Sequence, residues 1–469
     1  MNRILPALAF AALLAPASAF AAEPATKPHV LFLLADDMRA DSIAALGNPD
    51  VITPNLDAIV KRGFTFTNAY CQGGNSGAVC LPSRNMILSG NSYFRWKDSA
   101  PPNAPKGQRG MFAPADGPNF ARTMRDAGYL TYHHGKKGNV ATLLNASFEV
   151  NKYLKNDEAE RKSGEPGKEI VDEAIAFLKS NRDTRPLCVY LAFGNPHDPR
   201  VAAKAYLDRY DPAKLALPKN RLPIHPFDNG ELVVRDETLL PWPRTDADLR
   251  RTLHEYYATI TGLDFHIGRL MKAMQDAGLL ENTIVIFSSD QGIAVGSHGL
   301  LGKQNLYDHC MKAPLTFSGP GIKPGSSAAL AHLFDIAPTT CELVGVKPPE
   351  KIDGRSLRSV IRGDAAAARS ELMLSYREVQ RAIRDDRYKL IRYPAVNHTQ
   401  LFDLKTDPDE MKNLAADPSH AERVKDLTAR LAKLQASYGD TLPLLAKDAK
   451  SADPVTAEQL RARLKPAKK

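Results

Sequence analysis

Two apolar runs of the sequence, at 29–34 and 283–288, lead into side chains that carry oxygen atoms. These side chains are Asp36, Asp37, Asp290 and Gln291. Short apolar runs are typical of buried parallel strands, and open α/β sheets bind ligands beyond the carboxyl ends of such strands. Carboxylate and amide oxygens suit Ca²⁺, or less well Mg²⁺, better than Zn²⁺. The four residues are therefore candidate metal ligands, although an acidic pair after a strand, taken alone, is more often a helix N-cap or a surface turn.

A cysteine stands where a helix is expected to begin. Cys80 follows a glycine-rich turn at 73–77, and Arg84 lies one helical turn further along the chain. A thiol at a helix N-terminus beside an arginine is expected to have a lowered pKa. The residues alone leave two interpretations open, a nucleophilic cysteine and a buried structural cysteine.

The elements that must position these side chains alternate along the chain. We expect apolar strands at 29–34, 129–133, 187–193 and 283–288, and helices at 53–61, 119–126, 168–181 and 249–280, the last broken near Gly262 or Gly268. This alternation predicts an α/β fold with a large, mostly parallel sheet flanked by helices. Short strands at 371–376, 388–393 and 400–404, followed by a helix at 422–438, predict a smaller C-terminal α+β subdomain with an antiparallel sheet.

The composition of the 469 residues is that of a globular protein, with 43% hydrophobic and 25% charged residues. It excludes collagen-like, disordered and multi-span membrane proteins. The predicted division is a signal peptide at 1–22, a catalytic domain at 23–369, a subdomain at 370–445 and a basic tail at 446–469. The signal peptide predicts export, to a bacterial periplasm or beyond, and no later run is apolar enough for stable membrane insertion.

The net charge of +9 favours anionic partners, and the tail supplies about half of it. Because no aromatic residues are interleaved with its basic residues, we interpret the tail as a solvated end rather than a nucleic-acid-binding segment. The proline-rich excursion at 198–244 is irregular, which in a compact domain is usually functional. Its candidate substrate-binding residues are Arg200, Arg221, His225, Asp228, Glu231 and Arg235.

Short motifs in a fixed order connect these features. They are C-L-P-S-R at 80–84, T-P-N-L-D at 53–57, P-H-D-P at 196–199, S-D-Q-G at 289–292, H-G at 298–299, G-K at 302–303, Y-K-L at 388–390 and L-F-D-L at 401–404. In sequence and order they resemble the formylglycine-dependent type I sulfatases of the alkaline-phosphatase-like superfamily. The resemblance covers nearly all of the chain after the signal peptide.

The resemblance implies a chemistry for each matched residue. A separate maturation enzyme would oxidise Cys80 to Cα-formylglycine, whose hydrated aldehyde attacks sulfur. Ca²⁺ would be held by Asp36, Asp37, residue 80, Asp290 and Gln291. Arg84 would stabilise the hydrate, Lys136 and Lys303 would bind sulfate oxygens, and His197 would protonate the leaving alcohol. His298 is open between a substrate contact and a loop-packing residue.

Two positions depart from the family pattern. Gln291 stands where relatives commonly have Asn or His, although its longer side chain still offers a carbonyl ligand. Gly138 stands where many relatives have a histidine that acts on the hydrate. His133 and His134 are candidate substitutes for that histidine.

The resemblance implies hydrolysis of sulfate esters. We expect an O-sulfatase acting on sulfated carbohydrates, because Trp96 and Trp242 are the only tryptophans and no aromatic cluster marks an aryl-binding slot. A broad arylsulfatase and a phosphonate or phosphate ester hydrolase of the same superfamily are the alternatives. A phosphatase would require a Ser or Thr nucleophile and richer metal ligands. A non-enzymatic sulfoglycan-binding protein is a third interpretation, which the intact Cys80 and Arg84 disfavour.

Overall fold

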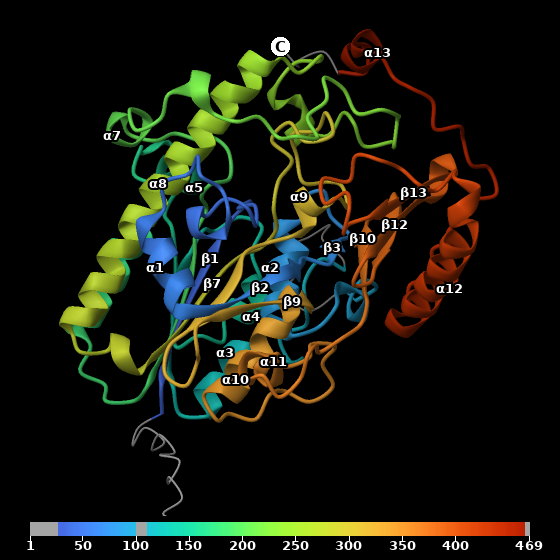
Figure 1. The fold of residues 1–469 in the computed structure, drawn as a ribbon. Helices are drawn as coiled ribbons and strands as arrows, with labels where there is room; N and C mark the ends of the chain where they lie inside the picture. Colours follow the sequence, from blue (N-terminus) through green and yellow to red (C-terminus); the bar gives the residue numbers. More distant parts are fainter. Residues whose placement is uncertain (1–26, 100–109, 465–469) are drawn as a thin grey trace, which may run out of the picture.

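Eight strands form the central sheet of the computed structural model, which describes residues 27–99 and 110–464 (Figure 1). Across the sheet they are ordered β5 (Val150–Tyr153), β4 (Leu130–Gly135), β6 (Leu187–Ala192), β1 (His29–Ala35), β7 (Thr283–Ser289), β8 (Leu315–Ser318), β2 (Gly63–Tyr70) and β9 (Gly325–His332). Every neighbouring pair is parallel except the two pairs that involve β8. The predicted mostly parallel sheet is confirmed. The predicted signal peptide lies outside the described residues.

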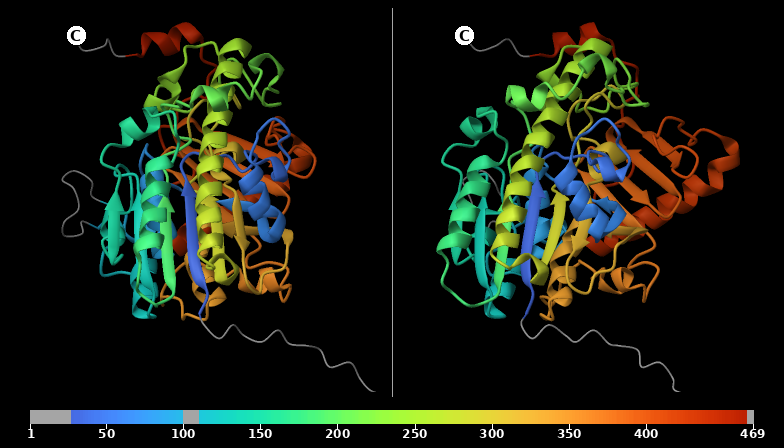
Figure 2. Two further views of the ribbon diagram at one scale, coloured as in Figure 1. Left: turned by 90° about the vertical axis from the view of Figure 1, so that its left-hand side faces the viewer. Right: turned by 60° about the vertical axis from the view of Figure 1, so that its left-hand side comes forward.

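Helices cover both faces of this sheet (Figure 2). The α-helices in this part of the chain are α1 (Pro54–Arg62), α2 (Cys80–Ser89), α3 (Phe120–Asp126), α4 (Thr142–Asn145), α5 (Asp157–Lys162), α6 (Lys168–Ser180), α8 (Asp246–Asp276), α9 (Asp308–Met311), α10 (Ile336–Leu343) and α11 (Arg358–Arg362). Alternate residues of β1 enter two different cores. Leu31 and Leu33 pack with α1, α6 and α8, whereas Phe32 and Leu34 pack with α2, α3 and α10. Burial on both faces explains why the strand is a continuous apolar run.

The longest helix, α8, is unbroken over 31 residues, so the expected break near Gly262 or Gly268 is wrong. Both glycines serve close packing instead. A Cβ at Gly262 would lie 2.8 Å from Pro166, and a Cβ at Gly268 would collide with the side chain of Asn55. The glycines therefore let α8 approach its neighbours without ending it.

A second sheet packs beside the first and contains β13 (His398–Asp403), β12 (Tyr388–Tyr393), β11 (Gln380–Arg384), β10 (Leu372–Tyr376) and β3 (Gly73–Gly74), in that order. Its strands are antiparallel except that β3 pairs in parallel with β10. The helix α12 (Ala421–Tyr438) covers it (Figure 1). Because β3 directly precedes the segment of Cys80, this small sheet supports the loop that leads to the predicted nucleophile.

The predicted irregular excursion contains the short helix α7 (Lys204–Leu207) and a 3₁₀ turn at Arg235–Leu239. The chain after α12 crosses to this excursion, where it forms α13 (Ala457–Ala462) (Figure 1). There Leu460 is fully buried, and Arg461 Nη1 donates to the carbonyl of Trp242 at 3.1 Å. Leu460 is thus an exception in a tail whose basic residues Lys447, Lys450, Arg461 and Arg463 are exposed. No helix within the described ranges has the length and apolar character needed to cross a membrane.

Candidate active site

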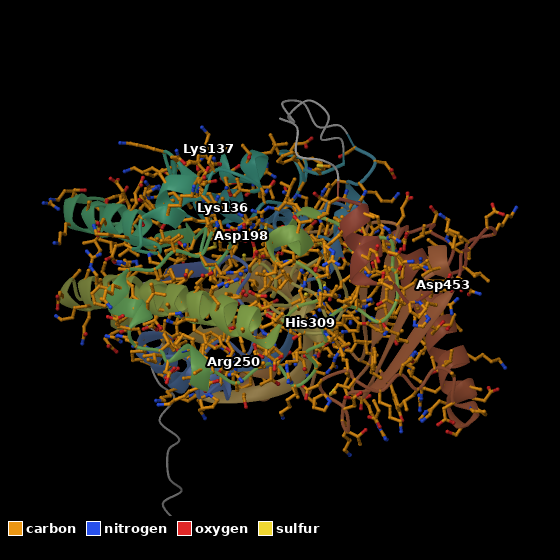
Figure 3. The ribbon with its side chains drawn as sticks, turned by 90° about the horizontal axis from the view of Figure 1, so that it is seen from above. Lys136, Lys137, Asp198, Arg250, His309 and Asp453 are labelled. Carbon is orange, nitrogen blue, oxygen red and sulfur yellow. The ribbon has the colours of Figure 1, made fainter. Side chains whose placement is uncertain are left out.

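Four neighbouring parallel strands, β4, β6, β1 and β7, deliver candidate residues to one edge of the large sheet. Lys136 follows β4, His197 follows β6 after a short loop, Asp36 follows β1, and Asp290 follows β7. Figure 3 looks down on this edge, where Lys136 and Asp198 are labelled. The order of the strands thus brings together residues far apart in the sequence, such as Gln291 and Asp37, which are 254 positions apart and hydrogen-bonded.

Three buried carboxylates form the centre of the site. Asp36, Asp37 and Asp290 are each at most 1% exposed. Together with the sulfur of Cys80, they offer one ligand atom each, and these four atoms lie within 4.8 Å of one another. This arrangement has the size of a single-ion site, because Ca²⁺ binds oxygen at roughly 2.3–2.6 Å.

Three cationic side chains are buried with the carboxylates. Lys136 Nζ contacts Asp36 Oδ2, and Lys303 Nζ donates to both oxygens of Asp37 at 2.8 Å. Arg84 Nε donates to Asp290 Oδ2 at 2.8 Å, and its Nη2 lies 3.5 Å from Asp36 Oδ2. Burial opposes ionisation of Asp36, yet Lys136 and Arg84 hold its pKa well below the ordinary value. The three carboxylates and three cations balance when all six are ionised. Burial and the charge of Asp36 raise the pKa of Asp290 to about 7, and a bound dication would favour its ionised form, leaving the pocket with a net charge of about +2 for an anionic substrate.

Cys80 lies in the middle of this charge cluster. Its Sγ donates to Asp36 Oδ1 at 3.1 Å and accepts at 3.1 Å from both Gln291 Nε2 and Lys303 Nζ. Burial, followed by the charge of Asp36, raises the thiol pKa well above its ordinary value. The expectation of a lowered pKa is therefore wrong, because helix position counts for less than burial beside carboxylates. A thiol held neutral in this way is a poor nucleophile.

The loop after β1 is held in a shape that presents its carboxylates. Asp37 has a φ of 63°, a left-handed conformation that Asp tolerates better than most residues. Its carbonyl accepts from the hydroxyl of Tyr256 on α8 at 2.8 Å, and its N–H donates to Asp290 Oδ1 at 3.2 Å. The long helix thereby fixes the backbone at the centre of the site.

His197 lies at the open side of the cluster, with 18% of its side chain exposed. Its Nε2 is 3.8 Å from Asp37 Oδ2, and its Nδ1 is 2.7 Å from the carbonyl of Asp198. Because a carbonyl only accepts, Nδ1 must carry a hydrogen, which leaves Nε2 free to exchange a proton. Burial and the charge of Lys303 lower the pKa of His197.

The remaining histidines of the sequence analysis lie elsewhere. The ring of His298 stacks on Tyr307 at 4.0 Å, with Nε2 2.9 Å from the carbonyl of Glu410, as expected of a loop-packing residue. His133 is fully buried, and its nitrogens contact Asn151 at 2.8 Å and Asn145 at 3.4 Å. Burial lowers the pKa of His133 to about 3. This position gives His133 no free nitrogen with which to replace the histidine expected at Gly138.

His134 and Gly138 also lie apart from the carboxylates. The strand alternation turns His134 away from His133, and its electrostatic neighbours are Glu173 on α6 and Lys152 on β5. Gly138 is exposed, and its N–H donates to Asp157 Oδ2 at 2.8 Å. The departure from the family motif at this position is thus accompanied by a local turn that Asp157 fixes.

The donor set fits a hard divalent cation. Besides the three carboxylates, Gln291 Oε1 is buried and has no hydrogen-bond partner among the described residues. Its amide nitrogen is already used, by Asp37 Oδ1 at 2.7 Å and by Cys80. An unpaired buried acceptor beside three carboxylates is what an oxygen-ligated ion would satisfy.

Sequence reasoning missed the residues that hold these groups from outside. Tyr256, Asp236 and Glu237 carry no motif, Ser83 had no role assigned within C-L-P-S-R, and Arg235 was expected to contact substrate. Ser83 Oγ donates to the carbonyl of Asp290 at 2.5 Å, and Arg235 binds the carboxylate of Asp198 with both terminal nitrogens. The only available signal was the unusual density of charge in the proline-rich excursion, which had suggested substrate contacts instead.

This arrangement, three carboxylates and three cations around a cysteine at a helix start on a parallel sheet, defines a hydrolase site for anionic esters. A family model described as Sulfatase matches residues 28–346, and one described as N-sulphoglucosamine sulphohydrolase, C-terminal, matches residues 296–437. The chain belongs to the sulfatase family and is a sulfuric ester hydrolase.

Characterised proteins and solved structures resemble the chain over most of its length. It is 28% identical to an N-acetylglucosamine-6-O-sulfatase of Bacteroides thetaiotaomicron, over 90% of this chain and 88% of that protein. A solved structure in complex with its substrate D-glucosamine-2-N,6-O-disulfate has a TM-score of 0.73 at 22% identity, covering 89% of this chain and 99% of that chain. The phosphonate monoester hydrolase of Agrobacterium radiobacter also has a TM-score of 0.73, at 21% identity, covering 88% and 96%. At such identities these structures establish the shared fold.

Proposed function

We propose that the protein is an O-sulfatase that removes sulfate from sulfated carbohydrates, with a formylglycine made from Cys80 as its nucleophile. One observation carries the proposal. The sulfur of Cys80 lies 3.1 Å from Asp36, Gln291 and Lys303 inside a charge-balanced, buried cluster. The similarity to an N-acetylglucosamine-6-O-sulfatase supports a sugar sulfate as substrate.

Two groups complete the proposed site. Ca²⁺ would be held by the carboxylates of Asp36, Asp37 and Asp290, the amide oxygen of Gln291 and an oxygen of modified residue 80, and it supplies Lewis acidity toward a sulfate oxygen. A formylglycine-generating enzyme would convert Cys80, and the hydrated aldehyde supplies a hydroxyl nucleophile where the thiol is unreactive.

Lys136 and Lys303 are the proposed ligands of the sulfate oxygens. Lys136 forms an ion pair with Asp36 and Lys303 forms one with Asp37, so the two ammonium groups approach the cluster from two sides. Both are nearly excluded from water, so their attraction for sulfate oxygens is stronger than it would be at the surface. Arg84 adds a buried Nη1 that has no hydrogen-bond partner within the described ranges. We assign this donor to the oxygen of the nucleophile.

His197 is the proposed general acid. It carries a hydrogen on Nδ1, as the contact with the Asp198 carbonyl requires, and presents Nε2 beside Asp37. A sugar alcohol is a poor leaving group, so proton donation from Nε2 matters more for sugars than for aryl esters. The negative charge of a bound sulfate acts against the lowering of the His197 pKa by burial and Lys303.

We place this activity outside the cytoplasm, in a bacterial periplasm or beyond. The support is the predicted signal peptide at 1–22 and the high pI of about 9.1, which suits a sulfated polysaccharide.

The test is sulfate release from a panel of sulfated mono- and oligosaccharides, with p-nitrophenyl sulfate, p-nitrophenyl phosphate and a phenyl phosphonate included. The protein is produced together with a formylglycine-generating enzyme, and Cys80→Ala is the blank. Release from one sugar position, lost in the blank, supports the proposal and identifies the ester. Turnover of the phosphorus esters alone would refute it.

A further inference from the structure

Three consecutive charged residues, Arg235, Asp236 and Glu237, face the site from the excursion. They occupy the first turn of the 3₁₀ segment Arg235–Leu239. Each binds a different neighbour of a proposed catalytic residue. We propose that these three residues, the 235–237 clamp, position His197 and Lys303 relative to each other. This inference rests on the proposed function, since it concerns how that site is held together.

The first member of the clamp acts on His197 through Asp198. Arg235 Nη1 donates to Asp198 Oδ1 at 2.7 Å, while Nη2 contacts Oδ2. The backbone carbonyl of Asp198 is the group that holds His197 Nδ1. Burial opposes the charge of Asp198, yet Arg235 lowers its pKa to about 2. The two-point pair fixes the direction of the peptide that orients the imidazole.

The second and third members act on the segment of Lys303. Glu237 accepts from the N–H of Leu301 at 2.9 Å and of Gly302 at 2.8 Å. Asp236 Oδ2 accepts from Gln304 Nε2 at 2.8 Å. The clamp therefore binds the residues on both sides of Lys303, and Lys303 in turn lowers the pKa of Asp236 against the effect of burial.

Gln304 extends the clamp to the nucleophile loop. Its Nε2 also donates to the carbonyl of Gly77 at 2.9 Å, three residues before Cys80. Gly302 shows how closely these parts fit. A Cβ on Gly302 would lie 2.9 Å from Asp236 Cβ and 3.1 Å from Glu237 Oε1. One short segment thus ties together the loops of the proposed acid, the sulfate-binding lysine and the nucleophile.

The interior side of the clamp is braced by Arg244. Its Nη2 donates to Glu237 Oε2 at 3.1 Å, and its guanidinium lies 4.5 Å over the ring of Trp242. Removing Glu237 would leave Arg244 buried without its carboxylate, and the protein would lose stability for reasons unrelated to catalysis. Arg235, whose side chain is 59% exposed, is therefore the better position to test.

The experiment compares Arg235→Ala with wild type on a sugar sulfate and on p-nitrophenyl sulfate. A positioned general acid contributes roughly 10²–10⁴-fold, so we expect loss of its orientation to lower kcat on the sugar sulfate about tenfold. The p-nitrophenolate leaves without protonation, so kcat on the aryl ester should stay close to wild type, and KM should change little for either ester. Arg235→Lys, which can hold one Asp198 oxygen at a time, should recover part of the loss.

Arg387→Ala is the matched control. Arg387 lies in the second sheet, between β11 and β12, has a side chain that is 47% exposed, and makes a two-point pair with Asp403 at 3.0 and 2.7 Å. It should keep wild-type kinetics on both esters. An equal loss on both esters in Arg235→Ala, or an equal effect of the two arginine variants, would overturn the inference.

A second variant tests the other half of the clamp. The new Cβ of Gly302→Ala would lie 2.3 Å from Gln304 Oε1, 2.9 Å from Asp236 Cβ and 3.1 Å from Glu237 Oε1, so this variant should displace Gln304 together with Asp236 and Glu237 from the segment of Lys303. Because sulfate binding is common to all substrates, this variant should lose kcat/KM by similar factors on both esters, in contrast to Arg235→Ala. The same leaving-group preference in both variants would contradict the division of roles.

The proposed function and the role of the clamp predict different results in these assays, so either can fail without the other. A wild type that cleaves aryl sulfates and no sugar sulfate refutes the sugar substrate. The clamp is then judged on aryl sulfates of increasing phenol pKa, where Arg235→Ala should fall progressively further below wild type as the phenol pKa rises. A parallel dependence in the two proteins would overturn the clamp alone, and a wild type inactive on every sulfate ester would overturn both.

Discussion

Replacing Gly73 with alanine should damage the active site through the second sheet. Gly73 has a φ of 99° and lies so close to Ser375 that a Cβ would collide with the carbonyl oxygen of that residue. Two backbone bonds hold this junction, from Ser375 N to the carbonyl of Gln72 at 2.8 Å and from Arg377 N to the carbonyl of Gly74 at 2.7 Å. Alanine can be accommodated only if β3 separates from β10.

The expected loss of stability follows from these contacts. An alanine held in a left-handed conformation costs about 1–2 kcal/mol. Separation of the strands removes two backbone hydrogen bonds, each contributing about 1 kcal/mol. The free energy of unfolding of Gly73→Ala should therefore fall by about 3–4 kcal/mol. Activity should fall further than stability alone requires, since the displaced segment leads directly to Cys80.

Gly47→Ala is the control, because Gly47 has a φ of 105° and its Cβ would have no atom within 4 Å. It should lose only the backbone component of about 1–2 kcal/mol and keep its activity. Stability is measured by denaturant unfolding, and kcat/KM is measured under conditions in which both variants are folded. Equal stability losses in the two variants, with full activity in Gly73→Ala, would refute the role of the β3–β10 junction.

Three further predictions concern buried groups. Burial raises the pKa of Glu160 to about 7 from 4.5, so its ionisation in the unfolded chain should cost the wild type about 3 kcal/mol of stability between pH 4.5 and pH 7; Glu160→Gln should lose about 3 kcal/mol less than wild type over this range in denaturant titrations, and parallel curves would contradict the reasoning. Removal of divalent ions with a chelator should abolish sulfate release and lower Tm, and Ca²⁺ should restore both better than Mg²⁺; full activity after exhaustive chelation would contradict the metal assignment. His133→Ala and His134→Ala should lower Tm but keep kcat per folded molecule, and a kcat loss above about 100-fold in either would return that residue to candidacy as a base.

The sequence was sufficient for the parts of the fold that local patterns encode. The strands β1, β6 and β7 are continuous apolar runs because both faces of the sheet are covered, and their polar ends meet because the strands are parallel neighbours. The positions of Asp36 and Asp290 in one cluster could therefore be predicted without coordinates.

The rest depended on contacts between distant segments. The strand β3 has two glycines and no strand-forming residue, so only its pairing with β10 defines it. The tail is basic in composition, yet Leu460 finds a buried position against the excursion. The contact of Arg235 with Asp198 spans 37 residues of proline-rich chain. The thiol pKa of Cys80 depends on carboxylates that no local rule places beside it.

The central claim is that residue 80 works as formylglycine in this cluster. The most direct measurement is the dependence of sulfate release on the fraction of residue 80 that carries the aldehyde, determined by peptide mass in preparations made with graded amounts of the maturation enzyme. The account predicts a rate proportional to that fraction and no activity in fully unconverted protein. Full activity in protein whose Cys80 is unmodified would contradict it.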